Sequence, residues 1–169
     1  MRILGIDPGY AIVGYGIVDS NGYKFDVVGF GAITTPAKMP FPKRLQAIYD
    51  DMLTIIKKYK PDELSIERLY FNTNTTTAID VAQARGVIIL AAESCGLKIN
   101  EYTPLQVKQS VTGYGKAEKF QVMEMVKSIL SLKSVPKPDD TADALALAVC
   151  HGHCAGSGVS KIISKEQIR

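Results

Sequence analysis

Four carboxylates stand in the sequence where their side chains could meet and do chemistry together. Asp7 and Glu67 each come directly after a short apolar run that is typical of a buried strand. Asp140 and Asp143 are three residues apart, so in a helix both carboxylates face the same direction. Open α/β sheets hold ligands at the ends of their strands. We therefore expect the four carboxylates to converge if the helix that carries the two aspartates abuts those strand ends.

The chemistry expected of such a set is metal-assisted hydrolysis of a phosphodiester. Four carboxylate ligands without an accompanying histidine, cysteine or dedicated nucleophile favour the hard cation Mg²⁺, or Mn²⁺ as its substitute, over zinc. Two ions about 3.5 to 4 Å apart can activate water on one side of a phosphate and stabilise the leaving oxygen on the other. The like charges repel one another, so a site without cations is expected to be strained.

Each carboxylate also has an ordinary structural explanation. Asp7-Pro8-Gly9 on its own is typical of a turn, and Glu67 on its own could be a carboxylate exposed at a strand end. Asp140 and Asp143 would also be favourable at the positive end of a helix without any catalytic role. Only the combination of all four points specifically to catalysis.

Lysines and one tyrosine are candidates for contacts with nucleic acid. Lys108, Lys116 and Lys119 supply point charges suited to backbone phosphates rather than to a particular base pattern. The alternative is a solvated lysine face. Tyr70 follows Glu67 by three residues and could stack on an unpaired base, or it could be an aromatic lid packed on the core.

The elements that must position these residues follow an order typical of an α/β domain. Strands are predicted at 3–6, 10–18, 23–34, 64–66 and 97–102, and the first three form an antiparallel meander. Helices are predicted at 45–59, 76–94, 104–111, around 122–130, and from about 140 to 150. This order predicts a three-layer α/β domain in which helices cover both faces of a mixed five-stranded sheet.

The composition fits one globular domain without a membrane segment. The chain has 169 residues, 46% of them hydrophobic, and can bury about two thirds of its unfolded surface in one core. Its net charge of +3 is too small to identify a nucleic-acid-binding protein by charge alone. The three cysteines form no framework of disulfides, and no apolar run approaches a signal peptide or the roughly 18 residues of a membrane span. We therefore expect a cytoplasmic protein.

The segment Cys150-His151-Gly152-His153-Cys154 has zinc-binding residue types at an unsuitable spacing. Five adjacent residues cannot easily wrap one ion tetrahedrally, and structural zinc sites use two separated pairs of ligands. The preferred interpretation is a pair of histidines near a helix end, where they interact with the negative end of the helix dipole.

Six short motifs, taken together and in this order, resemble the RuvC family of Holliday-junction resolvases. They are Gly5-Ile6-Asp7-Pro8-Gly9, Ile66-Glu67, Gln83-Ala84-Arg85-Gly86, Gln106-Val107-Lys108-Gln109, Ala117-Glu118-Lys119 and Asp140-Thr141-Ala142-Asp143-Ala144-Leu145. The resemblance covers nearly the whole chain to His153. It implies an RNase H-like nuclease domain over residues 1–154. Residues 155–169 have no hydrophobic period and are expected to form a flexible tail.

The resemblance also implies an activity and partners. The expected reaction is a pair of symmetric nicks across a four-way DNA junction that depends on Mg²⁺, with two ions in each active site. The four carboxylates fall on the family's catalytic, metal-binding positions, Lys108 and Lys119 on basic positions that contact DNA, and Tyr70 on an aromatic position beside the site. A homodimer and a branch-migration motor of the RuvA and RuvB type are the expected partners. The apolar segment from Thr76 to Ser94 is a candidate for both core packing and the dimer seam.

Three other functions fit parts of the sequence. A phosphotransferase of the sugar-kinase and actin type also opens with a strand, an aspartate, a glycine and a hairpin, but it needs a second lobe that 169 residues cannot supply. A junction-binding protein without catalysis is disfavoured by the complete set of four carboxylates. An RNase H-like nuclease with another substrate would be distinguished by its preference among junction, duplex and RNA–DNA hybrid.

Overall fold

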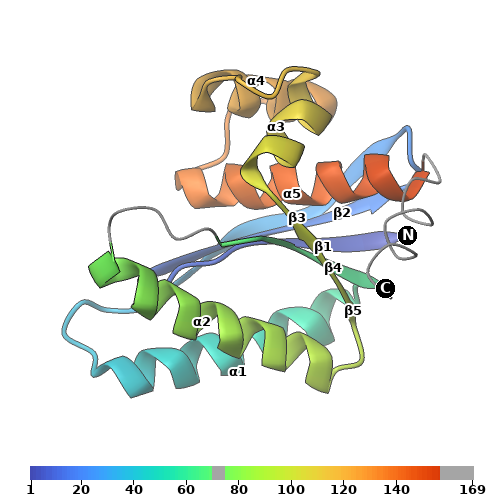
Figure 1. The fold of residues 1–169 in the computed structure, drawn as a ribbon. Coiled ribbons are helices and arrows are strands. Elements are labelled where there is room, and N and C mark those ends of the chain that lie inside the picture. The colour runs from blue at the N-terminus through green and yellow to red at the C-terminus, as the bar shows by residue number, and fades with distance from the viewer. Residues whose placement is uncertain (70–74, 157–169) are drawn as a thin grey trace, which may run out of the picture.

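A mixed five-stranded sheet forms the centre of the protein, and the computed structural model describes residues 1–69 and 75–156 (Figure 1). The strand order is β3-β2-β1-β4-β5. The strands are β1 (Arg2–Asp7), β2 (Ile12–Ser20), β3 (Phe25–Thr34), β4 (Glu63–Glu67) and β5 (Lys98–Tyr102). β1, β2 and β3 pair antiparallel, whereas β4 runs parallel to both β1 and β5. The predicted meander and mixed sheet are confirmed.

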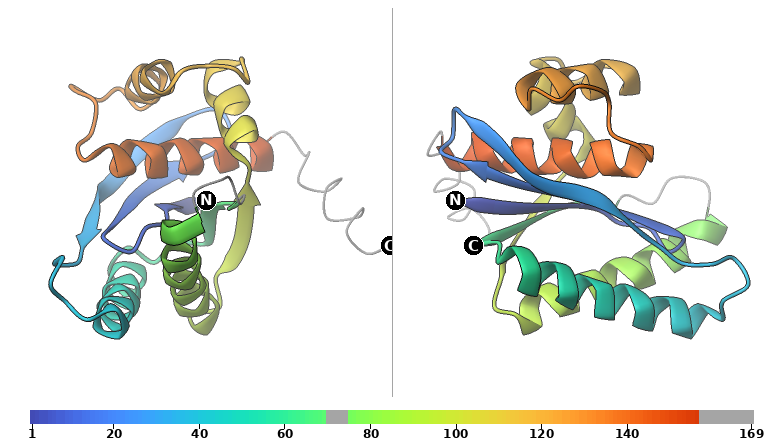
Figure 2. Two further views of the ribbon diagram at one scale, coloured as in Figure 1. Left: turned by 60° about the vertical axis from the view of Figure 1, so that its left-hand side comes forward. Right: turned by 180° about the vertical axis from the view of Figure 1, so that it is seen from behind.

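Helices cover both faces of this sheet, as the three-layer prediction required. They are α1 (Phe41–Tyr59), α2 (Thr75–Ser94), α3 (Pro104–Thr112), α4 (Lys119–Ile129) and α5 (Asp139–Gly156). α1 and α2 lie on one face, and α5 lies on the other with α3 and α4 packed outside it (Figures 1 and 2). Each face has its own apolar core, one centred on residues such as Ile48, Leu64 and Ile88, the other on Val126, Leu145 and Val149. No helix in the described ranges is long and apolar enough to cross a membrane.

Several predicted boundaries differ from the structure by a few residues, those of β3 and α5 among them. β3 begins at Phe25 rather than at Tyr23, because the side chain of Asn21 accepts hydrogen bonds from the backbone amides of Tyr23 and Lys24 and so holds them in the turn. α5 continues to Gly156 instead of ending near Cys150. The chain beyond 156, where most of the expected tail falls, lies outside the described residues.

The short helices that carry the lysines have well-defined ends. Thr103 caps α3, since its hydroxyl accepts the amide of Gln106 while the Gln106 side chain accepts the amide of Thr103. α3 then stops at Gly113, whose φ of 74° places it in the left-handed region that favours glycine. These ends fix which residues of α3 face the rest of the protein.

The approach of α5 to the sheet is close enough to exclude side chains from two positions. A Cβ atom added to Gly5 on β1 would clash with the carbonyl oxygen of Ala144, and one added to Gly14 on β2 would clash with the carbonyl oxygen of Asp140. Gly14 is also the residue that pairs with Asp7 across the two strands. Glycine at these positions therefore sets the distance between the start of α5 and the end of β1.

Gly14→Ala is expected to destabilise the protein by about 1 to 3 kcal/mol, because the added methyl group must displace the backbone of α5. Gly86→Ala is the matched control, since a Cβ at this helical glycine of α2 meets no atom within 4 Å and alanine favours the helix. Urea unfolding of both variants measures the difference. Equal stability of Gly14→Ala and the native chain would show that α5 does not depend on this contact.

Candidate active site

The ends of two parallel strands and the start of one helix bring the four carboxylates to one edge of the sheet. Asp7 is the last residue of β1, and Glu67 is the last residue of the neighbouring strand β4. Asp140 and Asp143 lie in the first two turns of α5, which packs on β1 and β2 at the glycines described above. All four side chains are partly buried. The strand-end geometry that the sequence predicted is therefore present.

Their negative charges act on one another. The pKa of the Asp7 carboxyl is raised to about 8, first by burial and then by the charges of the other three carboxylates, in the order Asp143, Glu67, Asp140. Burial and the charge of Asp143 likewise raise the pKa of Glu67. The four carboxylates thus repel one another in a partly buried site, and positive charge close to them would be stabilising.

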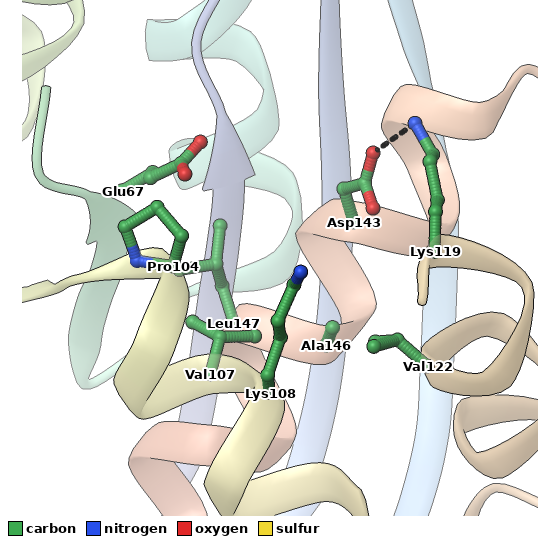
Figure 3. Close-up of a pocket in the computed structure, with 9 residues that line it drawn as sticks. All are labelled: Glu67, Pro104, Val107, Lys108, Lys119, Val122, Asp143, Ala146 and Leu147. Carbon is green, nitrogen blue, oxygen red and sulfur yellow. Dashed lines mark ion pairs between the residues drawn. The ribbon is translucent and has the colours of Figure 1, made fainter. Parts of the chain in front are cut away.

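Lys119 supplies a positive charge from within the protein. Its Nζ lies 2.9 Å from Oδ2 of Asp143 and 4.0 Å from Oδ2 of Asp139 (Figure 3). The hydrogen bond to Asp143 is the main reason that the pKa of Lys119 is raised. Asp139 is in turn 2.7 Å from Nζ of Lys137. Lys119 therefore links the first turn of α4 to the aspartates of α5.

The donor set suits a hard divalent cation, although the side chains do not enclose one in these positions. Over residues 1–69 and 75–156, no three His, Cys, Asp or Glu side chains stand close enough together to hold a metal ion. Lys119 already neutralises Asp143. Carboxylate oxygens are nevertheless the preferred ligands of Mg²⁺, and the raised pKa of Asp7 reports a local excess of negative charge that a cation would relieve. The chemistry of the residues fits the ion.

A cleft of about 290 Å³ opens beside these carboxylates. Glu67 and Asp143 lie on its rim, and the side chains of Lys108 from α3 and Lys119 from α4 reach toward them (Figure 3). The remainder of the lining is mostly apolar and consists of Pro104, Val107, Val122, Ala146 and Leu147. A phosphodiester entering this cleft would meet two ammonium groups at the same edge as the carboxylates.

Two predicted DNA contacts are not placed in the cleft. Lys116 is exposed in the connection between α3 and α4 and is not one of the residues that line the cleft. Tyr70 lies outside the described residues. The ion pair between Lys119 and Asp143 was not predicted, because 24 residues separate the partners and no local periodicity links them.

The two histidines near the end of α5 both make contacts within the protein. His151 is buried, with Nδ1 2.7 Å from the hydroxyl of Tyr102 and Nε2 3.0 Å from Oε2 of Glu63. Burial lowers the pKa of His151, which favours the neutral ring. His153 lies edge-on to Phe25, and burial lowers its pKa as well. The dipole interpretation does not describe His151, whose ring nitrogens are both engaged by Tyr102 and Glu63, whereas His153 does lie in the last turn of α5.

The sheet, the layers of helices and the acidic strand ends define the class of protein. It is an α/β nuclease of the RNase H-like type, whose carboxylates lie at two strand ends and one helix start beside a cleft that also holds two lysines. The family model described as crossover junction endodeoxyribonuclease RuvC matches residues 3–151. The chain therefore belongs to the RuvC family, as the sequence motifs indicated.

Individual relatives agree with this assignment. A crossover junction endodeoxyribonuclease RuvC of Brevibacillus brevis is 59% identical over 151 residues, covering 89% of this chain and 91% of the relative. The structure of Thermus thermophilus RuvC has a TM-score of 0.86 at 34% identity and covers 94% of this chain and 97% of that one. The same protein in complex with a Holliday junction substrate has a TM-score of 0.85 at 31% identity, with the same coverage. The predicted RNase H-like fold is thereby confirmed.

The raised pKa of Asp7 predicts a pH-dependent cost to folding in the absence of divalent cations. The folded state favours the protonated carboxyl, so this favourable contribution is complete below about pH 4 and is lost as the pH rises through the folded pKa of about 8. Asp7→Asn does not titrate there. With a chelator present, the variant should gain about 1 to 3 kcal/mol over the native chain between pH 4 and pH 8.

Thermal unfolding across this pH range, with the exposed Asp51→Asn as a control, measures the effect. A stability difference between Asp7→Asn and the native chain that stays constant from pH 4 to pH 8 would contradict the assigned electrostatic strain.

Proposed function

We propose that this chain is a structure-selective endodeoxyribonuclease that resolves four-way DNA junctions. It nicks two strands symmetrically by metal-dependent hydrolysis of phosphodiesters and serves DNA recombination and repair. The observation that carries the proposal is a set of four carboxylates whose charges act on one another, two of which, Glu67 and Asp143, line a cleft together with Lys108 and Lys119. The similar T. thermophilus protein has been solved with a Holliday junction substrate, which supports this choice of DNA.

The proposed metal ligands are Asp7, Glu67, Asp140 and Asp143, and the proposed cofactor is a pair of Mg²⁺ ions, for which Mn²⁺ can substitute. Bound there, the ions would supply activation of water and stabilisation of the leaving oxygen. The chain itself contributes four carboxylates held at fixed backbone positions by β1, β4 and α5. It also contributes Lys119, whose ammonium group neutralises part of the charge of Asp143 through Oδ2 of that carboxylate.

The lysines of α3 and α4 are proposed to bind the phosphates of the junction. Lys108 is partly buried and reaches into the cleft, so its position is restricted by its surroundings (Figure 3). Lys119 is exposed, so its ammonium group can leave Asp143 and bind a phosphate oxygen instead. This change of partner does not require the charge of Lys119 to become more buried. Lys116 and Tyr70 are proposed as additional contacts, to a phosphate and to an unpaired base at the crossover, respectively.

A second copy of the chain is the proposed partner in solution. Ile79 and Leu90 on α2 each expose 58% of their surface, and their spacing of eleven residues places them on the same side of the helix. Two related copies would present two active sites to the two strands that must be cut. A branch-migration motor of the RuvA and RuvB type is proposed as the further partner, and the cytoplasm as the location. Support for the motor and the location is family membership alone.

Replacing any one of the four carboxylates by its amide is expected to abolish cleavage, because the amide retains the side-chain volume and removes one metal-binding charge. The four variants are Asp7→Asn, Glu67→Gln, Asp140→Asn and Asp143→Asn. Binding of the junction should remain within a few-fold of native. The assay uses a synthetic four-way junction with end-labelled strands, so that the nicks are mapped, and a linear duplex and an RNA–DNA hybrid as competing substrates. A native rate in the Asp7→Asn variant, or equal cleavage of the three substrates, would refute the proposal.

Lys108→Ala and Lys119→Ala are expected to weaken junction binding for all sequences and to reduce the slope of log affinity against log salt concentration by about one unit each. Lys57→Ala, on the opposite face of the sheet in α1, is the matched control and should change neither quantity. Fluorescence anisotropy over a range of salt concentrations measures both. Unchanged slopes in both variants would show that these ammonium groups face solvent rather than phosphate.

A further inference from the structure

Arg85 on α2 contacts the backbone of Glu67. Its Nε donates a hydrogen bond to the carbonyl oxygen of Glu67 at 2.9 Å. Its Nη2 lies 2.9 Å from Oε1 of Glu101 on β5. The side chain is only 15% exposed, so the guanidinium is held between these two acceptors rather than free in solvent. The planar fork of a guanidinium restrains both partners in direction as well as in distance.

The carbonyl of Glu67 lies at the end of β4, where the chain leaves the sheet. Glu67 is the last residue of β4, and its pairing partner on β5 is Tyr102. The next amide, that of Arg68, donates to the carbonyl of Tyr102 at 2.8 Å, which holds the strand end on the β5 side. The β1 ladder ends one residue earlier, at Ile66. The peptide between Glu67 and Arg68 is thus held at both of its polar atoms: its amide donates to Tyr102 and its carbonyl accepts from Arg85.

This contact also brings positive charge near the Glu67 carboxylate. Burial raises the pKa of Glu67, and the charge of Asp143 raises it further, whereas Lys119 and Arg85 lower it. Lys119 is exposed and is proposed above to move onto a phosphate. Arg85 is mostly buried and tied to Glu101, so its charge stays in place when Lys119 leaves.

We infer that Arg85 is a positioning residue of the active site, which holds the backbone of Glu67 from α2 and is itself held by Glu101. The inference rests on the proposed catalytic role of Glu67. A purely structural contact between helix and sheet would affect stability and DNA binding together. A positioning role instead requires that turnover falls while the affinity for the junction is retained.

The test compares Arg85→Met, Arg85→Lys, Glu101→Gln and Glu67→Gln in the full-length chain. Single-turnover cleavage is measured at saturating junction and Mg²⁺, at a fixed interval below the melting temperature of each variant, and junction affinity is measured separately. Arg85→Met should reduce the cleavage rate about 10- to 100-fold with affinity within about twofold of native, as expected for a group that orients a metal ligand.

The conservative variants separate the two contacts of Arg85. Arg85→Lys keeps the charge but loses the fork, and should recover only part of the rate. Glu101→Gln leaves the hydrogen bond to the Glu67 carbonyl intact and should lower the rate about threefold or less.

Each outcome distinguishes the inference from the proposed function. If Glu67→Gln is inactive while Arg85→Met cuts at the native rate, the inference about Arg85 is overturned and the proposed function stands. A loss in Arg85→Met that is matched by an equal loss of junction affinity also overturns it. If Glu67→Gln cuts at the native rate, the role of Glu67 and the inference fall together.

Discussion

The close packing of α5 against β1 and β2 is the constraint on which the site depends. Glycine at positions 5 and 14 lets the helix backbone contact the strand backbones directly, where any side chain would clash with a carbonyl oxygen of α5. Because Gly14 pairs with Asp7 and meets Asp140, one contact sets the separation of two carboxylates. Backbone packing is stiff and close to the density of crystals, so it fixes that separation more firmly than flexible side chains could.

The site stores electrostatic repulsion that the fold must withstand. Burial and mutual repulsion raise the pKa of Asp7 to about 8, and the ion pair between Lys119 and Asp143 relieves only part of the excess charge. The burial of apolar side chains in the two cores stabilises the fold and offsets the electrostatic cost of the site. Strain of this kind is typical of functional sites, where groups are arranged for a ligand instead of for the free protein.

Much of the fold follows from local patterns that the sequence displays directly. β1 and β4 were predicted because short apolar runs end at Asp7 and Glu67, and α1 because its apolar residues recur at helical spacing. The end of α5 was not predictable, since the helix continues where buried His151 and Gly152 pack on the sheet. That packing depends on Phe25 and Ser20, which are distant in sequence.

The residues of the site could be named from the sequence, the carboxylates as well as Lys108 and Lys119, but the contacts between its helices and the sheet could not. The carboxylates stand beside elements whose ends can be read from the sequence, and the two aspartates of α5 share one helical face. The salt bridge of Lys119 and the hydrogen bond from Arg85 to the Glu67 carbonyl join separate elements. Such contacts depend on how helices dock on the sheet, which hydrophobic periodicity does not determine.

The placement of α3 and α4 outside α5 has an evolutionary consequence. The acidic groups are carried by strands and by a helix that are built into the two cores, so a change in the apolar residues of these elements disturbs folding and catalysis at once. The ammonium groups of Lys108 and Lys119 are carried by the outward positions of two short outer helices, whose inner positions, such as Val111 and Val126, pack in the second core (Figure 1). Mutations at the exposed positions of these two helices can accumulate with little effect on the sheet. Substitutions there can therefore change the specificity and the affinity for DNA during evolution, while the carboxylates that catalyse hydrolysis stay the same.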